Sequence, residues 1–241
     1  MKKQSLLFML LLLSSMIFIQ CASDTSNSEE PVTEETTTAD TEENTPEENN
    51  STSATASKIL NPNLDGAAAL AALPGVTEDI AKELEANRPI LNMTALNDIL
   101  KKSLSEEQLA ALYPQLFVPI NLNVASEEEM MLVPGVGKKL AHEFEEYRPY
   151  AAPEQFRREM GKYIDDDEIA RIEKYVFVPV NLNTATDEQI KSIPGVGDKM
   201  LHEFKEYRPF KSIEQFNREI GKYVDDKELA RLGRYVTLTE G

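Results

Sequence analysis

The sequence from residue 121 to residue 180 is followed directly by a second copy of itself, and this repetition limits what the chain can fold into. When residues 121–180 are set against residues 181–240 without gaps, 32 of the 60 positions are identical. A weaker copy precedes them, with Asn61 and the turn Pro74-Gly75-Val76 each 60 residues before their counterparts. A repeat of this kind is one small structural unit whose apolar face is buried by neighbouring copies. The sequence therefore predicts a tandem array of three units, at 58–120, 121–180 and 181–241.

The first residues are expected to direct export and to stay outside the folded units. Lys2 and Lys3 precede an apolar run from Leu6 to Ile19, which is typical of a secretory signal peptide over residues 1–20. Cys21 is the only cysteine and stands where a signal peptidase would cut, so it resembles the lipid-attachment site of a bacterial lipoprotein. We therefore expect an exported protein that is anchored to a membrane of the cell envelope through a lipid on Cys21.

The residue before the cysteine leaves alternatives open. The lipoprotein pattern has a small residue there, whereas this chain has Gln20, so an ordinary secretory signal or an uncleaved anchor is the alternative. Residues 21–57 are rich in Ser, Thr, Asn and acidic residues, and Val32 is their only strongly apolar side chain. Such a composition buries too little apolar surface to offset the entropy lost on ordering. This segment is therefore predicted to be a disordered acidic tether.

The charge of the chain is unevenly distributed. The net charge of −17 comes from 25 basic and 42 acidic side chains. Residues 1–60 hold 3 basic and 10 acidic side chains, whereas residues 181–241 hold 10 and 11. Much of the acidity therefore lies before the repeats, but no repeat is basic. This counts against strong nucleic-acid binding, which usually requires a clustered positive surface.

Each of the two similar copies is predicted to contain four helices. Ser126 to Glu129, and Thr186 to Gln189 in the next copy, match a capping box, in which two side chains satisfy free backbone donors. A first helix of two turns should then end before Pro134, because the residue before proline disfavours helix. The other helices are expected to follow Gly137, to lie near Pro153 to Met160, and to begin after an aspartate cap at 165–167.

The order of these motifs resembles the helix-hairpin-helix domain of competence-type DNA receptors. Asn-x-Asn-x-Ala, Pro-Gly-Val-Gly between two helices, and Tyr-Arg-Pro carry the resemblance over 121–236, and more loosely over 61–118. Members of that family are exported, attached to a membrane, and bind double-stranded DNA without sequence preference. The resemblance implies an all-α fold and phosphate contacts by the hairpin backbone and by adjacent lysines. The implied DNA-binding residues are Gly135, Val136, Gly137, Lys138 and Lys139, with Gly195, Val196, Gly197 and Lys199 in the last copy.

The chain departs from the family pattern in three places. The second glycine hairpin of the family is replaced by sequences in which an aspartate pair, such as Asp165-Asp166, follows a single glycine. In the first copy, Thr77 replaces the second hairpin glycine, and Glu78 and Asp79 replace the lysines, so this hairpin is expected to be structural only. In the last copy, Asp198 replaces the first lysine. The hairpin at 135–139 is therefore the one with the full sequence.

Other candidate residues have two interpretations. A set of basic side chains would either flank a phosphate track or form a solvated surface: Arg148, Lys162, Arg171, Lys174, Arg208, Lys222, Lys227, Arg231 and Arg234. The aromatic side chains of Tyr147, Phe156, Tyr163 and Tyr175 are expected in the core. His142 and His202 lie 60 residues apart, so we predict no metal site from them.

The sequence leaves two hypotheses for function. It contains no recognisable catalytic arrangement and no phosphate loop, so we predict a protein that is not an enzyme and needs no cofactor or small-molecule substrate. The first hypothesis is an envelope-anchored protein that binds double-stranded DNA and takes part in its capture or uptake. The alternative is a protein–protein interaction scaffold, because the first copy, with its alanine run at 67–72, resembles the extrinsic photosystem II subunit, which uses this fold to dock on proteins.

Overall fold

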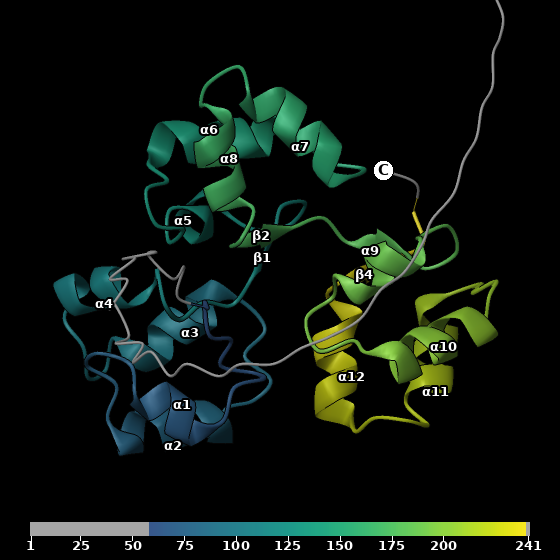
Figure 1. Ribbon diagram of the computed structural model, residues 1–241, viewed down its shortest axis with the longest axis horizontal. Coiled ribbons are helices and arrows are strands. Elements are labelled where there is room, and N and C mark those ends of the chain that lie inside the picture. Colours follow the sequence, from purple (N-terminus) through teal and green to yellow (C-terminus); the bar gives the residue numbers. More distant parts are fainter. Residues whose placement is uncertain (1–57, 240–241) are drawn as a thin grey trace, which may run out of the picture. The chain divides into compact units, whose positions relative to one another are not determined.

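The computed structural model describes residues 58–239, which form twelve helices and four short strands (Figure 1). The predicted signal peptide, Cys21 and the predicted tether lie outside the described residues. In chain order the elements are α1 (Ala67–Ala71), α2 (Glu78–Ala86), α3 (Met93–Leu100), α4 (Glu106–Leu112), β1 (Ile120–Asn121), α5 (Glu127–Met130), α6 (Lys138–Glu146), α7 (Pro153–Met160), α8 (Asp166–Ile172), β2 (Val176–Phe177), β3 (Val180–Asn181), α9 (Asp187–Lys191), α10 (Asp198–Glu206), α11 (Ile213–Ile220), α12 (Asp226–Gly233) and β4 (Val236–Thr237). The described chain is mostly helical, as predicted.

The helices fall into three groups of four, which we call the first unit (α1–α4), the second unit (α5–α8) and the third unit (α9–α12). Corresponding helices start 60 residues apart: α2, α6 and α10 begin at Glu78, Lys138 and Asp198, and each has nine residues. The expected third helix, Pro153–Met160, and the expected aspartate cap at Asp165 are both present. The helix bounds thus follow the sequence repeat closely.

Short parallel strand pairs, which the sequence did not predict, join the start of each unit to its end. β1 pairs with β2, β3 pairs with β4, and Leu60 forms an isolated bridge with Leu116. Each strand has two residues, which is too short for an alternating pattern to be recognised. The apolar segment 177–180, between the second and third units, therefore supplies residues to two different strand pairs.

The buried apolar side chains form two clusters. The larger cluster extends from Leu70 to Val178 and includes both the first and the second unit. The smaller cluster extends from Leu182 to Val236 and belongs to the third unit. Phe177 packs against the smaller cluster, and its ring centroid lies 4.3 Å from that of Tyr235. The first and second units therefore share one core, whereas the third has its own.

The predicted capping boxes differ between the two similar copies. At the start of α9, Thr186 and Gln189 form the complete reciprocal pair. At the start of α5, the Ser126 hydroxyl accepts from the N–H of Glu129, but the Glu129 carboxylate instead accepts from the N–H of Met93 at 2.9 Å. At Ser126 the predicted bond to the hydroxyl is present, but the predicted bond to the Glu129 carboxylate is wrong, because this carboxylate accepts from the N–H of Met93 in the first unit. Both helices are also shorter than the two turns expected, with four residues in α5 and five in α9.

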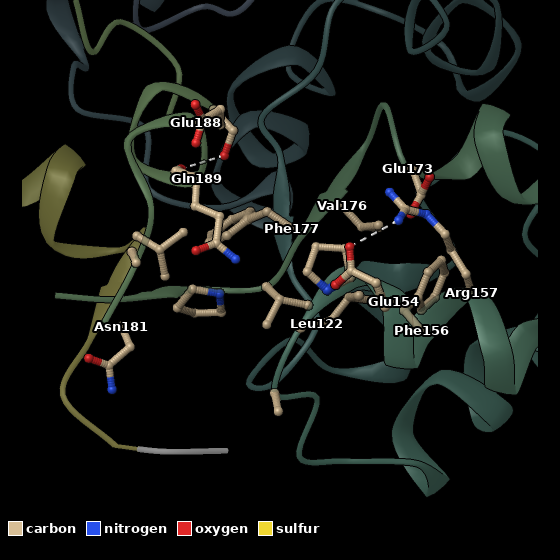
Figure 2. A pocket seen from close by; sticks show the side chains of 18 of the residues that line it. Leu122, Glu154, Phe156, Arg157, Glu173, Val176, Phe177, Asn181, Glu188 and Gln189 are labelled. Atoms are coloured by element: carbon tan, nitrogen blue, oxygen red, sulfur yellow. Dashed lines mark hydrogen bonds and ion pairs between the residues drawn. The ribbon is translucent and has the colours of Figure 1, made fainter. Parts of the chain in front are cut away.

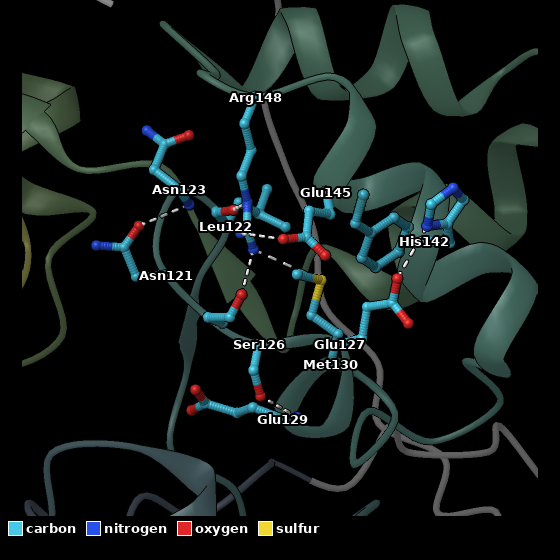
Figure 3. A network of polar contacts seen from close by, with 12 residues as sticks. Asn121, Leu122, Asn123, Ser126, Glu127, Glu129, Met130, His142, Glu145 and Arg148 are labelled. Carbon is cyan, nitrogen blue, oxygen red and sulfur yellow. Dashed lines mark hydrogen bonds and ion pairs between the residues drawn. The ribbon is translucent and has the colours of Figure 1, made fainter.

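In the second unit, a network of polar contacts holds the loop before the first helix against the residues that follow the second helix (Figure 3). The Asn121 side chain accepts from the N–H of Asn123 at 2.9 Å. The Asn123 side chain in turn accepts from the N–H of Tyr150 at 2.7 Å and donates to its carbonyl at 2.9 Å. The Arg148 guanidinium donates to the carbonyls of Leu122 and Ala125. We call these contacts the Asn–Arg clamp.

The clamp is present in all three units. In the third unit, Asn183 makes the same two bonds to Phe210, and Arg208 donates to the carbonyls of Leu182 and Ala185. In the first unit, Asn63 makes the same two bonds to Ile90, and Arg88 donates to the carbonyls of Pro62 and Asp65. The Asn-x-Asn and Arg-Pro motifs are therefore two halves of one structural device.

Substituting Asn123 with alanine should destabilise the fold by about 2–4 kcal/mol, because it leaves a partly buried N–H and a partly buried carbonyl of Tyr150 without a partner. The matched control is Asn217→Ala, since Asn217 is exposed and its side chain makes no hydrogen bond within residues 58–239. The control should change stability by less than about 0.5 kcal/mol. Urea unfolding followed by circular dichroism measures both, and equal losses would contradict the role given to the clamp.

Candidate nucleic-acid interface

The first glycine of each hairpin is required by the backbone. Gly75, Gly135 and Gly195 have φ values of 80°, 81° and 84°, in the left-handed region that side chains rarely adopt. The turn is closed by a hydrogen bond from the N–H of Val136 to the carbonyl of Val133 at 3.0 Å, and the third unit repeats it. These glycines therefore shape the turn in all three units, whatever the turn binds.

The N–H of Val136 was expected to contact a phosphate, but it is already used in a hydrogen bond within the turn. It donates to Val133 within the turn, and that of Val196 donates likewise to Ile193. Both side chains are buried, at 5% and 8% exposed. These two residues therefore hold the hairpin in shape instead of offering a donor to a ligand.

The second glycine of the hairpin is not required by the backbone. Gly137 has φ −93° and Gly197 has φ −100°, values that other residues adopt readily. A Cβ built on either would meet no atom within 4 Å. Neither α6 nor α10 has a side-chain cap, and within the described residues the N–H groups of Gly137, Lys138 and Lys139 have no acceptor. The glycine thus leaves the start of the helix open to an anion.

The first unit closes the same position. Thr77 stands where Gly137 stands in the second unit, and its hydroxyl accepts from the N–H of Ile80 at 3.3 Å. Glu78 and Asp79 follow in the first turn of α2. A capped helix start beside two carboxylates repels an anion. The geometry therefore agrees with the expectation that this hairpin is structural.

The charges at the two open helix starts differ. Lys138 and Lys139 are exposed and form no salt bridge within the described residues. In the third unit, Lys199 is exposed, and Asp198 pairs with Lys191 at 2.5 Å. The hydrogen bond from Lys191 lowers the pKa of the Asp198 carboxyl, so this side chain is charged at neutral pH. The second unit therefore offers two unpaired cations and the third offers one.

Two arginines that the sequence analysis placed at the surface lie behind the hairpins. A Cβ on Gly135 would come within 2.7 Å of the Arg171 guanidinium, and one on Gly195 within 3.0 Å of that of Arg231. Arg231 is 2% exposed and donates to the carbonyl of Pro194 at 2.6 Å. Both interpretations of Arg231 were therefore wrong, because it is neither solvated nor available to a phosphate. Arginine recurs at this position at a spacing of 60 residues, but 32 positions do so, and the recurrence alone did not separate a structural role from a binding role.

Three more arginines, Arg148, Arg208 and Arg234, use their guanidinium groups in hydrogen bonds to backbone carbonyls. The first two belong to the Asn–Arg clamp, and Arg234 donates to the carbonyl of Pro119 at 2.9 Å and lies near the ring of Phe177. They do not form the phosphate track that we considered. Lys162 and Lys222 are exposed but pair with Glu159 and Glu219.

An exposed tyrosine stands beside the open start of α6. Tyr163 is 41% exposed, so the expectation that it lies in the core was wrong, whereas Phe156 and Tyr175 are buried as expected. Its hydroxyl is 2.9 Å from that of Tyr147, and hydrogen bonds to Tyr147 and Glu143 raise its pKa. A groove of about 430 Å³ separates it from the helix start. The groove is lined by Gly137, Lys138, Lys139, Leu140, Glu143, Tyr163 and Ile164.

The two histidines lie on the exposed surface of their helices. His142 Nδ1 is 2.8 Å from Glu127, and this hydrogen bond raises the pKa of His142 (Figure 3). His202 lies 3.5 Å from Glu206. Residues 58–239 contain no group of three or more His, Cys, Asp or Glu side chains that could hold a metal ion. In the same residues, no helix has the length and apolar character needed to cross a bilayer.

Comparison with known proteins identifies the motif that surrounds the hairpin. A family model described as helix-hairpin-helix motif matches residues 115–177, which include all four helices of the second unit. The chain therefore contains a helix-hairpin-helix motif, which is consistent with nucleic-acid binding. No solved structure matches the chain.

The chain is also similar to part of a larger vertebrate protein, endonuclease/exonuclease/phosphatase family domain-containing protein 1. The identity is 27% for the protein of Bos taurus, over 41% of this chain and 25% of that protein. It is 30% for that of Danio rerio, over 39% of this chain and 23% of that protein. The human protein is 26% identical, over 42% of this chain and 25% of its own length. The chain thus spans about a quarter of the length of these relatives.

Proposed function

We propose that the protein binds double-stranded DNA without sequence preference through the open helix starts of its second and third units. The observation that carries the proposal is that Gly137 and Gly197 leave the first turns of α6 and α10 without a side-chain cap, whereas Thr77 caps the first turn of α2 through the N–H of Ile80. Unpaired N–H groups and the positive end of the helix dipole favour a phosphate at such a position. The helix-hairpin-helix motif matched over 115–177 supports the same assignment.

In this proposal each residue of the hairpin has a distinct part. The N–H groups of Gly137, Lys138 and Lys139 receive the phosphate, and the two lysine side chains add charge. In the third unit, Gly197 and Lys199 do the same with less charge, because Asp198 is present. Gly135 and Gly195, with Val136 and Val196, give the turns their shape. The binding is salt-sensitive and weak, with a Kd on the order of 10⁻⁴ to 10⁻⁶ M at physiological salt.

The proposal treats each of 58–120, 121–180 and 181–241 as one helix-hairpin-helix unit, of which the first is structural. It includes no catalytic step, because no nucleophile, metal site or phosphate loop is recognisable in the sequence. The enzyme classes in the name of the vertebrate relatives do not enter it, since the similarity covers only a quarter of those proteins.

The hairpin assignment is tested by moving the cap of the first unit into the other two. The double variant Gly137→Thr/Gly197→Thr should fold with its stability unchanged to within about 0.5 kcal/mol, because threonine and glycine are similar as helix caps. Its Kd for duplex DNA at low salt should rise at least about tenfold, because each new threonine caps the N–H three residues on, as Thr77 does, and its side chain occupies the space at the helix start where the phosphate would bind. Fluorescence anisotropy with a labelled duplex measures the change.

The matched control for this variant is Gly66→Thr. Gly66 also caps a helix without a side-chain bond, and a Cβ built on it would meet no atom within 4 Å, but the hairpins are elsewhere in the sequence. This control should bind DNA as the wild type does. Unchanged binding by the double variant, or equal loss in the control, would refute the hairpin assignment.

We further propose that the protein acts at the cell envelope, held there by a lipid on Cys21 and an acidic tether over residues 21–57. The support is the sequence alone: a basic start, an apolar run from Leu6 to Ile19, and a single cysteine at its end. A DNA-binding domain placed outside the membrane in this way would serve in the capture or uptake of external DNA.

Replacing Cys21 with serine tests the anchor, because serine cannot carry the thioether-linked lipid. The wild-type protein should sediment with membranes and incorporate labelled palmitate, whereas Cys21→Ser should lose the label and move to the soluble fraction. Retention of the variant in membranes without any label would show an uncleaved anchor instead of a lipid.

A further inference from the structure

A hollow lies where the second unit meets the third (Figure 2). It has a volume of about 480 Å³, within the range of about 300–1,000 Å³ typical of ligand sites. Its apolar lining comes from Leu122, Phe156 and the segment 176–180, and its polar lining comes from α7, from Glu173 after α8, and from residues 181–192 in and around α9. We call it the junction hollow.

The junction between the first and second units is filled by the chain itself. Met93 is fully buried there, and its N–H donates to the Glu129 carboxylate at 2.9 Å. Its sulfur accepts from the N–H of Val118 at 3.3 Å. One long, unbranched side chain thus fills the space and also satisfies a backbone donor. A junction between two units can therefore hold a buried methionine side chain with a hydrogen bond to its sulfur.

The corresponding positions of the next junction, 60 residues later, line the junction hollow. They are Pro153, Val178 and Gln189. Proline has no N–H and no long side chain, so nothing takes the part of Met93. The N–H of Val178, a residue only 8% exposed, has no acceptor within residues 58–239. Gln189 turns back to cap α9 by accepting from the N–H of Thr186 at 2.8 Å.

The charge around the junction hollow is negative. Three glutamates, Glu154, Glu173 and Glu188, line it with a single arginine, Arg157. Arg157 lies 3.2 Å from Glu154 and 2.7 Å from Glu173, so its charge is already paired. Three acids against one base leave an excess of two negative charges. An occupant with basic side chains is therefore favoured over a neutral or acidic one.

We propose that the junction hollow binds an extended peptide segment of a partner protein that carries a methionine-like side chain flanked by lysine or arginine. The apolar side chain fills the space that Met93 fills in the preceding junction. A backbone carbonyl of the peptide accepts from the N–H of Val178, as the Met93 sulfur does from Val118. The basic side chains face Glu154, Glu173 and Glu188. This site is separate from the hairpins and does not depend on DNA binding.

The probe is a synthetic peptide, acetyl-Lys-Leu-Asn-Met-Thr-Lys-amide, which surrounds the Met93 sequence with lysines. Binding to the whole protein is followed by isothermal titration calorimetry and by the chemical shift of the Val178 amide. Replacing the peptide methionine with alanine should weaken binding by about tenfold or more, because it removes most of the buried apolar side chain. Replacing both lysines with glutamate should also weaken it. No binding, or no shift at Val178, would overturn the proposal.

The double variant Pro153→Met/Gln189→Glu copies the filled junction into the second one. It should raise the melting temperature, abolish peptide binding and leave DNA binding unchanged. Peptide binding that survives in a folded double variant would overturn the proposal. If this variant does not fold, Glu154→Lys/Glu188→Lys changes two exposed side chains and should exchange the preference from the lysine peptide to the glutamate peptide.

Sedimentation distinguishes a partner peptide from a second copy of the chain. Under the proposal the wild type does not self-associate through this surface, so its sedimentation is the same as that of the double variant. A wild-type dimer that Pro153→Met/Gln189→Glu abolishes would overturn the proposal in favour of self-association.

Discussion

The structure depends on the Asn–Arg clamp, which ties the loop before the first helix of a unit to the residues that follow the second helix. In the second unit, the Asn123 side chain forms hydrogen bonds with both the N–H and the carbonyl of Tyr150. The Arg148 guanidinium donates to the carbonyls of Leu122 and Ala125. These bonds fix the two helices on either side of the hairpin. The hairpin therefore stands between elements whose ends are held together, and its exposed helix start is fixed before any ligand arrives.

The three units show which features of the sequence belong to the fold and which to the site. The clamp and the first hairpin glycine are present in all three, so they are required by the fold. The second glycine is not required by the backbone, and the first unit replaces it with Thr77. The open helix start is accompanied by Arg171 or Arg231 behind the turn, where the first unit has Ala111. The site is thus a small variation on a shared structural unit.

Much of the fold could be predicted from the sequence because its signals are local. Proline, glycine and capping residues placed the helices of the second unit, including Pro153–Met160 and the Asp165 cap. The errors arose where a distant residue competes with a local one, as when Met93 takes the Glu129 carboxylate away from its capping box. The short strand pairs were missed because each strand has two residues, too few for a pattern, and pairs with residues 56 positions away.

The candidate site was predicted as a segment but not in its details. The pattern Pro-Gly-Val-Gly identified both turns. It could not show that the N–H of Val136 is used inside the turn of the second unit, or that Arg231 is buried behind the turn of the third. Both facts depend on three-dimensional packing. Charge counts were also too coarse, because an ion pair such as Lys191 with Asp198 alters the local field without changing the net charge.

The most direct test is to record amide chemical shifts of the protein during titration with a short DNA duplex at low and at high salt. The proposed function predicts that the largest shifts fall on Gly137 to Lys139 and Gly197 to Lys199, that Thr77 to Asp79 do not respond, and that the shifts shrink as salt is added. Shifts that are absent from both open hairpins, or that are as large in the first unit as in the other two, would contradict it.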